Sequence, residues 1–208
     1  PLSLYVHIPF CNTICYYCAS NKVVTKVHGR SAKYIRYLAK EVALLSALVE
    51  PGATVKQLHL GGGTPTFLSG EGKGQLVRAL EHHFAFDATC QRSIEVDPRT
   101  VTPEAVAMLA NLGFNRMSLG VQDFDAEVQR AVNRLQSESD TLDVIHAARA
   151  NGFQSLNVDL IYGLPRQTVP GFAVTLDKII EAAPDRIALY SYAHVPHLFK
   201  PQRRISES

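Results

Sequence analysis

The sequence has almost no excess of charge of either sign. Its 208 residues include 21 Lys and Arg residues against 19 Asp and Glu residues, which leaves a formal net charge of +2. A nucleic-acid-binding protein normally concentrates basic residues on one face, so this balance argues against that class. Basic residues are scattered until the run that contains Lys200, Arg203 and Arg204, and so short a run is typical of a solvated segment.

Long apolar runs and a disulfide pattern are also missing. No stretch approaches the roughly 20 apolar residues that a membrane-spanning helix needs. The opening segment Pro1–Leu4 lacks the basic and apolar regions of a signal peptide. Only four cysteines are present, and the crowding of three of them does not suggest a disulfide framework. We therefore expect a cytoplasmic protein without a membrane span.

The crowded cysteines are Cys11, Cys15 and Cys18, whereas Cys90 stands alone and is expected to be buried and inert. Soft thiolate sulfur suits iron, zinc and copper(I). Three thiolates from one loop would leave one iron of a four-iron cluster without a protein ligand, and that iron could bind a substrate or cosubstrate. The pattern therefore predicts an iron–sulfur cluster with an open iron.

Two other interpretations of the cysteines compete with an iron–sulfur cluster. The spacing i, i+4, i+7 is also that of one helix face, where cysteine is often a small buried hydrophobic residue. Pro9 and the indifferent helix formers between the cysteines argue against such a helix. Zinc would need a fourth ligand, for which His7 or His28 could serve. The cluster interpretation is favoured over both.

The apolar pattern alternates between strand-like and helix-like segments. Short β-rich runs predict strands at Leu2–Ile8, Val55–Leu60, Ser93–Val96, Arg116–Val121, Leu156–Tyr162 and Arg186–Tyr192. Helical spacing predicts apolar helix faces over residues 35–49 and 76–84 and further helices over residues 141–150 and 169–182. A further helix is expected between residues 84 and 141, because Thr102 and Pro103 are typical of a helix start and Gly113 is typical of a helix end.

Six strands separated by helices predict a parallel sheet with right-handed crossovers. Six units are too few to close the usual eight-stranded barrel. Two architectures remain, an open curved sheet of (β/α)6 type and a flat doubly wound sheet. In both, a ligand lies at the carboxyl ends of the strands, in the loops that lead to helices.

Polar residues and glycines do follow nearly every predicted strand. The cysteines follow the first strand and Gly61–Pro65 follows the second. Glycines without β-carbons let the backbone approach a ligand closely. Glu95 and Asp159 stand within apolar strands, where a carboxylate is costly unless it is paired, and this favours ligand contact. The other strand ends carry Asp97, Gln122, Asp123 and His194.

The pattern C-x3-C-x2-C after a strand resembles the signature of radical S-adenosylmethionine (radical SAM) enzymes. The longer run Leu4–Val24 is similar to the oxygen-independent coproporphyrinogen III oxidase family, and the likeness extends over essentially the whole chain, including residues 95–99, 120–124 and 159–165. It implies an α/β fold with an open curved parallel sheet, a partial (β/α)6 TIM-like barrel. It also implies that residues 1–208 are a catalytic core, a fragment without the N-terminal and C-terminal segments that cover the substrate.

The resemblance implies a [4Fe–4S] cluster on Cys11, Cys15 and Cys18 and two molecules of S-adenosylmethionine. Positions that resemble those around the cluster-bound molecule are Tyr5, Gly62 and Glu95. Positions that resemble those around the second molecule are Gly63, Thr64, Gln122, Arg134, Asp159 and Ala193. His7 is either a residue that tunes the cluster or a structural imidazole. Ser20 stands where the family has a fourth cysteine, a candidate catalytic position that is not a cluster ligand.

The function implied by the resemblance is the oxidative decarboxylation of coproporphyrinogen III propionates to vinyl groups, giving protoporphyrinogen IX for anaerobic haem biosynthesis. The implied partners are the tetrapyrrole and a reducing donor such as flavodoxin or ferredoxin, and we expect a monomer that binds no nucleic acid. The alternatives are a haem chaperone of the same family, an anaerobic haem-degrading radical SAM enzyme and, last, a zinc-stabilised (β/α) protein.

Overall fold

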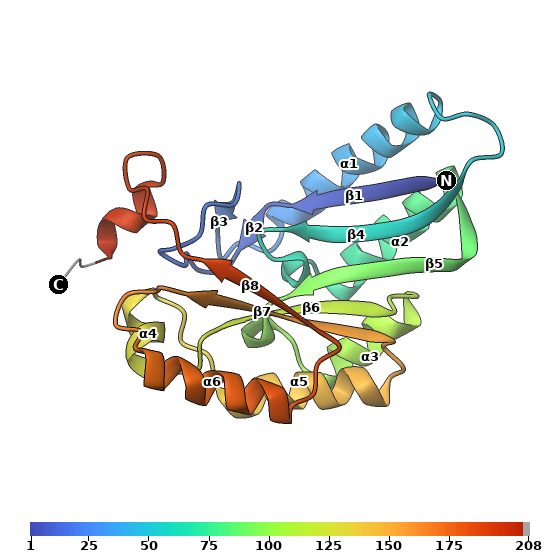
Figure 1. Cartoon of the computed structure of the whole chain (residues 1–208). Helices are drawn as coiled ribbons and strands as arrows, with labels where there is room; N and C mark the ends of the chain where they lie inside the picture. The colour runs from blue at the N-terminus through green and yellow to red at the C-terminus, as the bar shows by residue number, and fades with distance from the viewer. Residues whose placement is uncertain (206–208) are drawn as a thin grey trace.

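The computed structural model describes residues 1–205, and its main feature is one parallel sheet (Figure 1). Within the described residues the sheet has six strands in the order β1-β4-β5-β6-β7-β8, and every neighbouring pair is parallel. The expected open parallel sheet is thus confirmed, with β1 and β8 at its two edges. The strands are β1 (Leu2–Ile8), β4 (Thr54–Gly62), β5 (Ala85–Val96), β6 (Arg116–Gln122), β7 (Ser155–Tyr162) and β8 (Arg186–Ser191).

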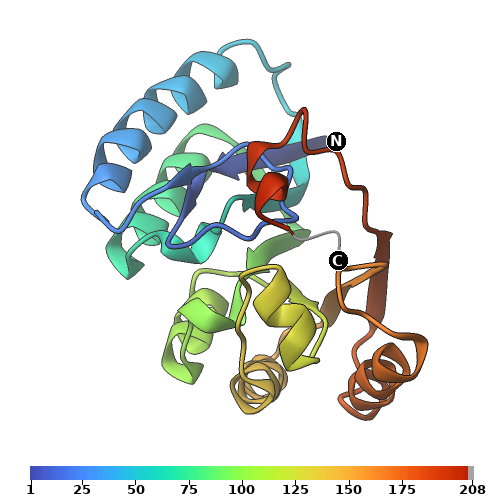
Figure 2. The same cartoon turned by 90° about the vertical axis from the view of Figure 1, so that its left-hand side faces the viewer.

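The order of the strands in the sheet follows their order in the chain. Right-handed crossovers that always advance in one direction place all their helices on one face of the sheet. Figure 2 shows this arrangement, with the helices outside a curved sheet, and it excludes the doubly wound alternative, which needs a reversal of strand order. The helices are α1 (Arg30–Ser46), α2 (Gly70–His83), α3 (Pro103–Asn111), α4 (Ala126–Ala131), α5 (Glu138–Ala150) and α6 (Val169–Glu181).

The side chains of each strand alternate between the helix-covered face and the open face. On β6, Met117, Leu119 and Val121 are buried against the helices, whereas Ser118 and Gly120 lie on the other face. The apolar set from β1, β4, β5, β6 and β7 joins the helices into a main core cluster, and α6 packs on a smaller one. The fold therefore buries one face of the sheet and leaves the other polar and open to a ligand.

Helix ends agree with the expected caps. The Thr102 hydroxyl accepts a hydrogen bond from the Ala105 amide at 3.4 Å, and Gly113 follows α3 with a φ of +85°. Helix α5 begins three residues before the expected start, because Ser137 accepts a hydrogen bond from the Asp140 amide and caps it there. The short helix α4 was not predicted, since a six-residue segment shows too little of the helical period.

Strand β5 is longer than its apolar pattern indicates. It begins at Ala85 rather than Ser93, because its polar first half pairs with β4 across a register shift between Val55 and Gln57. Cys90 consequently lies inside the strand, where it is buried as expected. Among the described residues no helix combines the length and apolarity needed to span a membrane.

Candidate functional site

A cavity of about 530 Å³ lies at the carboxyl ends of the strands. Most of the residues singled out from the sequence line it, although they come from loops far apart in the chain. These are Cys11, Cys15, Cys18, Ser20, Gly62, Gly63, Thr64, Glu95, Gln122, Arg134 and Asp159. Two expected site residues, Tyr5 and Ala193, are not among those that line it in the part of the chain that the structure describes.

The cysteine loop is not helical. A small parallel pair, β2 (Phe10–Cys11) and β3 (Val23–Val24), closes the loop at its base, and residues 12–22 contain no helix. Cys11 and Cys15 are buried and Cys18 is half-buried, but all three line the cavity. The interpretation of these cysteines as a helix stripe is therefore wrong.

Side chains from distant segments hold the backbone of this loop. Asn133 donates a hydrogen bond to the Ile14 carbonyl at 2.7 Å, and Lys22 donates one to the Cys18 carbonyl at 2.8 Å. Gln202, in η3 (Lys200–Arg204), donates to the Tyr17 carbonyl at 3.2 Å and to the Ala193 carbonyl at 3.0 Å. The segment after β8 thus takes part in positioning the cysteines. Ala193 is linked to the loop because Gln202 donates hydrogen bonds to both backbones.

The zinc alternative finds no support in the geometry. His7 bonds to the Asn21 carbonyl at 2.9 Å and to the Tyr5 hydroxyl at 3.0 Å, and His28 stacks on Phe67. Within residues 1–205 no three His, Cys, Asp or Glu side chains are arranged to hold one metal ion. A cluster of several irons takes each thiolate on a different iron, and all three cysteines line the same cavity. The donor set around the cavity therefore fits an iron–sulfur cluster.

The glycine turn that begins at the end of β4 lies directly against the cysteine loop. Gly62 has a φ of +117°, which side-chain-bearing residues rarely adopt, and its amide donates to a Glu95 oxygen at 3.1 Å. A β-carbon on Gly63 would lie 2.9 Å from Cys11 Sγ and 2.8 Å from the Pro9 backbone. Thr64 donates its hydroxyl to Cys11 Sγ at 3.5 Å. The turn and the first cysteine are therefore fitted to each other.

This contact makes a prediction for Gly63→Ala. The Pro9 backbone cannot swing away as a flexible side chain could, so the added methyl should displace Cys11 and lower cluster loading several-fold. Iron and acid-labile sulfide per chain after anaerobic reconstitution measure the effect. Gly29→Ala is the matched control, because a β-carbon there meets nothing within 4 Å. Equal loading of Gly63→Ala and the parent chain would contradict the prediction.

Glu95 is held by a group that sequence reasoning missed. The His59 Nε2 atom lies 3.2 Å from Glu95 Oε1, and the His59 ring stacks on the Tyr5 ring at 5.7 Å between centroids. Burial and the negative charge of Glu95 raise the pKa of Tyr5. Tyr5 therefore does not line the cavity itself, and it is linked to Glu95 through its contact with His59. The strand alternation of β4 could have indicated His59, because it shares the open face with Gly61.

Asp159 forms the centre of a second polar group on the open face. The Ser118 hydroxyl donates to one carboxylate oxygen at 3.0 Å, and the Asn157 amide donates to the other at 2.7 Å. Burial raises the pKa of Asp159 and the charge of Glu95 adds to this, while the two hydrogen bonds oppose it. Asp159 is thus oriented into the cavity with acceptor capacity left for a ligand.

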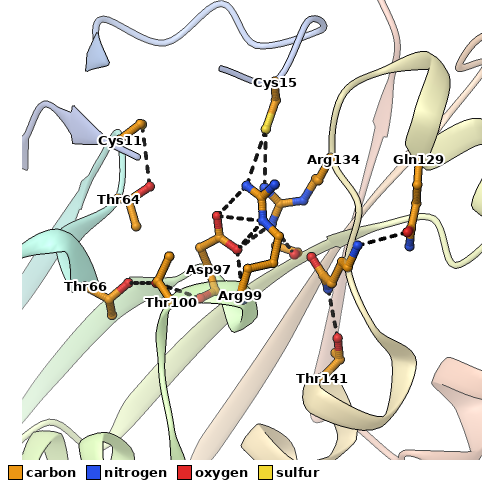
Figure 3. A network of polar contacts seen from close by, with 12 residues as sticks. Cys11, Cys15, Thr64, Thr66, Asp97, Arg99, Thr100, Gln129, Arg134 and Thr141 are labelled. Atoms are coloured by element: carbon orange, nitrogen blue, oxygen red, sulfur yellow. Dashed lines mark hydrogen bonds and ion pairs between the residues drawn. The ribbon is translucent and has the colours of Figure 1, made fainter. Parts of the chain in front are cut away.

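A third group surrounds Cys15, and Figure 3 shows its side chains converging on the sulfur. Arg134 Nη1 lies 3.6 Å and Arg99 Nη2 3.7 Å from Cys15 Sγ. Asp97 lies between the two guanidinium groups, at 2.6 Å from Arg99 and 3.5 Å from Arg134. Burial opposes the ionisation of Asp97, but the two arginines outweigh it and hold its pKa below the ordinary value.

Arg134 follows α4, outside any helix, and is buried rather than exposed. Its side chain is only 8% exposed, and it also donates to the Gly120 carbonyl at 2.5 Å. Its Nε atom is buried without a hydrogen-bond partner in the described part of the chain, so it has a donor left over beside the cavity. From the sequence, Asp97 was expected only as a polar residue at a strand end, and Arg99 was given no role. The position of Arg99 just after a strand was the available signal.

Comparison with known proteins shows the family to which this chain belongs. The radical SAM superfamily model matches residues 5–179. The chain therefore belongs to the radical SAM superfamily, whose membership implies a [4Fe–4S] cluster and S-adenosylmethionine. The solved structure of methylornithine synthase matches with a TM-score of 0.63 at 13% identity, over 92% of this chain and 53% of the synthase chain. At this identity the match shows only that the two share a fold.

Within the superfamily the chain is similar to oxygen-independent coproporphyrinogen III oxidases. It is 51% identical over 208 residues to the oxygen-independent coproporphyrinogen III oxidase of Pseudomonas aeruginosa, covering 99% of this chain and 45% of the relative. The structure of coproporphyrinogen III oxidase (HemN) from Escherichia coli superposes with a TM-score of 0.97 at 47% identity, over 100% of this chain and 48% of that one. The expected resemblance is confirmed, and the chain spans about half the length of these relatives.

Proposed function

We propose that this chain is the catalytic core of an oxygen-independent coproporphyrinogen III oxidase. The observation that carries the proposal is 51% identity to such an enzyme across 99% of the chain. The cavity supports it, because it gathers the three cysteines, the glycine turn and both carboxylates at one edge of the sheet. The reaction would convert propionate side chains of coproporphyrinogen III into vinyl groups, for anaerobic haem biosynthesis.

In this proposal Cys11, Cys15 and Cys18 hold the cluster. Bound and reduced, the cluster would supply the electron that starts radical chemistry on S-adenosylmethionine. An electron acceptor would take up the electron released with carbon dioxide when a propionate becomes a vinyl group. The chain's own residues that line the cavity would bind and orient the reactants.

Two molecules of S-adenosylmethionine are part of the proposal. Gly62 and Glu95, backed by Tyr5, would contact the molecule on the open iron. The second molecule would contact Gly63, Thr64, Gln122, Arg134, Asp159 and Ala193. Glu95 and Asp159 are close enough for the charge of Glu95 to raise the pKa of Asp159. Their proximity supports two adjacent sites in one cavity. We further propose a cytoplasmic monomer that receives electrons from reduced flavodoxin or ferredoxin.

Loss of either carboxylate should weaken S-adenosylmethionine binding. Glu95→Gln and Asp159→Asn each remove a charged acceptor from a partly desolvated site, worth about 1.5–3 kcal/mol, or roughly ten- to a hundredfold in affinity. Isothermal titration of the reconstituted chain measures this. Asp87→Asn is the control, because it makes the same chemical change at the far end of β5, where Asp87 pairs with Lys56. Unchanged affinity in both site variants would show that these residues do not bind the cosubstrate.

The activity itself is tested by anaerobic incubation with coproporphyrinogen III, dithionite and S-adenosylmethionine. The proposal expects 5′-deoxyadenosine together with vinyl-bearing product.

Ser20 lines the cavity, but a hydroxyl gives up hydrogen to a carbon radical far less readily than a thiol does. The product formed per S-adenosylmethionine consumed should therefore be compared in the parent and in Ser20→Cys. Cleavage of S-adenosylmethionine without tetrapyrrole product in either protein would contradict the assigned substrate.

A further inference from the structure

The three cysteines differ in what touches their sulfur atoms. Cys15 Sγ faces two charged donors, Arg99 at 3.7 Å and Arg134 at 3.6 Å, whereas Cys11 Sγ accepts a bond from the neutral hydroxyl of Thr64 at 3.5 Å. Because both arginines lie against Cys15 while Cys11 meets a neutral hydroxyl, the electrostatic surroundings of these two sulfur atoms are unequal.

Asp97 keeps the two arginines in place. Arg99 donates to Asp97 through Nε at 2.9 Å and through Nη2 at 2.6 Å, in a two-point contact that fixes the plane of its guanidinium group. The three side chains are largely shielded from water, with 20% of Arg99, 11% of Asp97 and 8% of Arg134 exposed. Two cations and one anion leave a net charge of +1 beside Cys15, in a site where water screens it weakly.

We propose that Arg99, through its hydrogen bond to Cys15, raises the reduction potential of the cluster held by the three cysteines. This inference rests on the proposed function, since it requires that the cysteines bind the cluster. Reduction adds one electron to the cluster, from a one-electron donor, and therefore adds one negative charge next to Cys15. A cation and an N–H···S hydrogen bond stabilise that extra charge, so they favour the reduced state.

Arg99 is a better test of this role than Arg134. Removing Arg134 would take away one of the two cationic partners of the buried Asp97 and also the donor to the Gly120 carbonyl. A change in potential would then be mixed with a structural effect. Removing Arg99 leaves Asp97 and Arg134 as a neutral pair. Arg99 is also the more exposed of the two, so its loss disturbs the packing less.

The experiment is a potentiometric titration of the anaerobically reconstituted 208-residue chain, followed by the electron paramagnetic resonance signal of the reduced cluster. In Arg99→Met we expect the ratio of reduced to oxidised cluster, at the parent's midpoint potential, to fall about tenfold, which is about 59 mV for a one-electron couple. Arg99→Lys, which keeps the charge, should recover part of this shift. Arg116→Met is the control, because it removes the same charge where Arg116 bonds to Ser155 at the other end of β6.

The outcomes separate this inference from the proposed function. A parent chain that assembles no cluster would contradict the proposed function. A parent and an Arg99→Met variant that load equal iron and share one midpoint potential would overturn the inference alone, as would an equal shift in Arg116→Met. If Arg99→Met does not load iron, Arg99→Gln replaces it. Failure of both to load, while Arg99→Lys loads with the parent's potential, would make Arg99 a structural residue and also overturn the inference.

Discussion

Replacing any one of Cys11, Cys15 or Cys18 by Ala should abolish the [4Fe–4S] cluster. Each thiolate would bind a different iron, and in residues 1–205 no other side chain that lines the cavity carries sulfur. The parent chain, reconstituted anaerobically, should instead show an iron–sulfur resonance signal that changes when S-adenosylmethionine is added. Iron and sulfide content and the resonance spectrum measure both results.

Cys90→Ala is the matched control for this experiment. Cys90 is buried in β5, and its sulfur lies 3.8 Å from the Gln91 carbonyl rather than at the cavity. Its removal should leave cluster content unchanged, although the lost packing lowers stability. Stoichiometric zinc with no iron–sulfur absorption in the parent chain would contradict the cluster assignment. So would full cluster loading of any of the three Ala variants.

The largest expected effect on stability comes from Asp97→Asn. The substitution keeps an oxygen that can accept from the Arg99 amide, but it leaves Arg99 and Arg134 largely buried without their anion. Breaking a buried ion pair by removing one partner costs about 3–5 kcal/mol of folding free energy. Urea unfolding of the cluster-free chain measures the change. Glu127→Gln, in an exposed pair with Arg130, is the control and should cost much less.

The same variant should alter the dependence of stability on pH. The pKa of Asp97 is lower in the folded protein than its ordinary value. Below about pH 4 the unfolded chain therefore takes up this proton first, so Asp97 stabilises the fold above that pH and loses its contribution as the pH falls further. Asp97→Asn should lose less free energy of unfolding on acidification than the parent does. An identical slope in both proteins would show that Asp97 is not held as an anion.

Local sequence patterns were sufficient for most of the elements. Runs such as Leu156–Tyr162 carry their strand preference in consecutive residues, and Thr102, Pro103 and Gly113 mark the ends of α3. These signals work because strand period, capping and turn geometry depend on neighbours in the chain. The first half of β5 escaped prediction because its pairing with β4, not its own composition, makes it a strand.

The sequence by itself determined the class of site, since the three thiolates, the glycine turn and the strand-end carboxylates are each readable from spacing. Only the tertiary structure decided what surrounds them. Arg99 and Arg134 meet Cys15 from 84 and 119 residues away, and Asp97 between them cannot be placed without the sheet order. The physical reason is that a parallel sheet brings the carboxyl ends of all its strands to one edge, so side chains from separate loops converge there. Their contacts depend on the register and direction of each strand, which no local pattern contains.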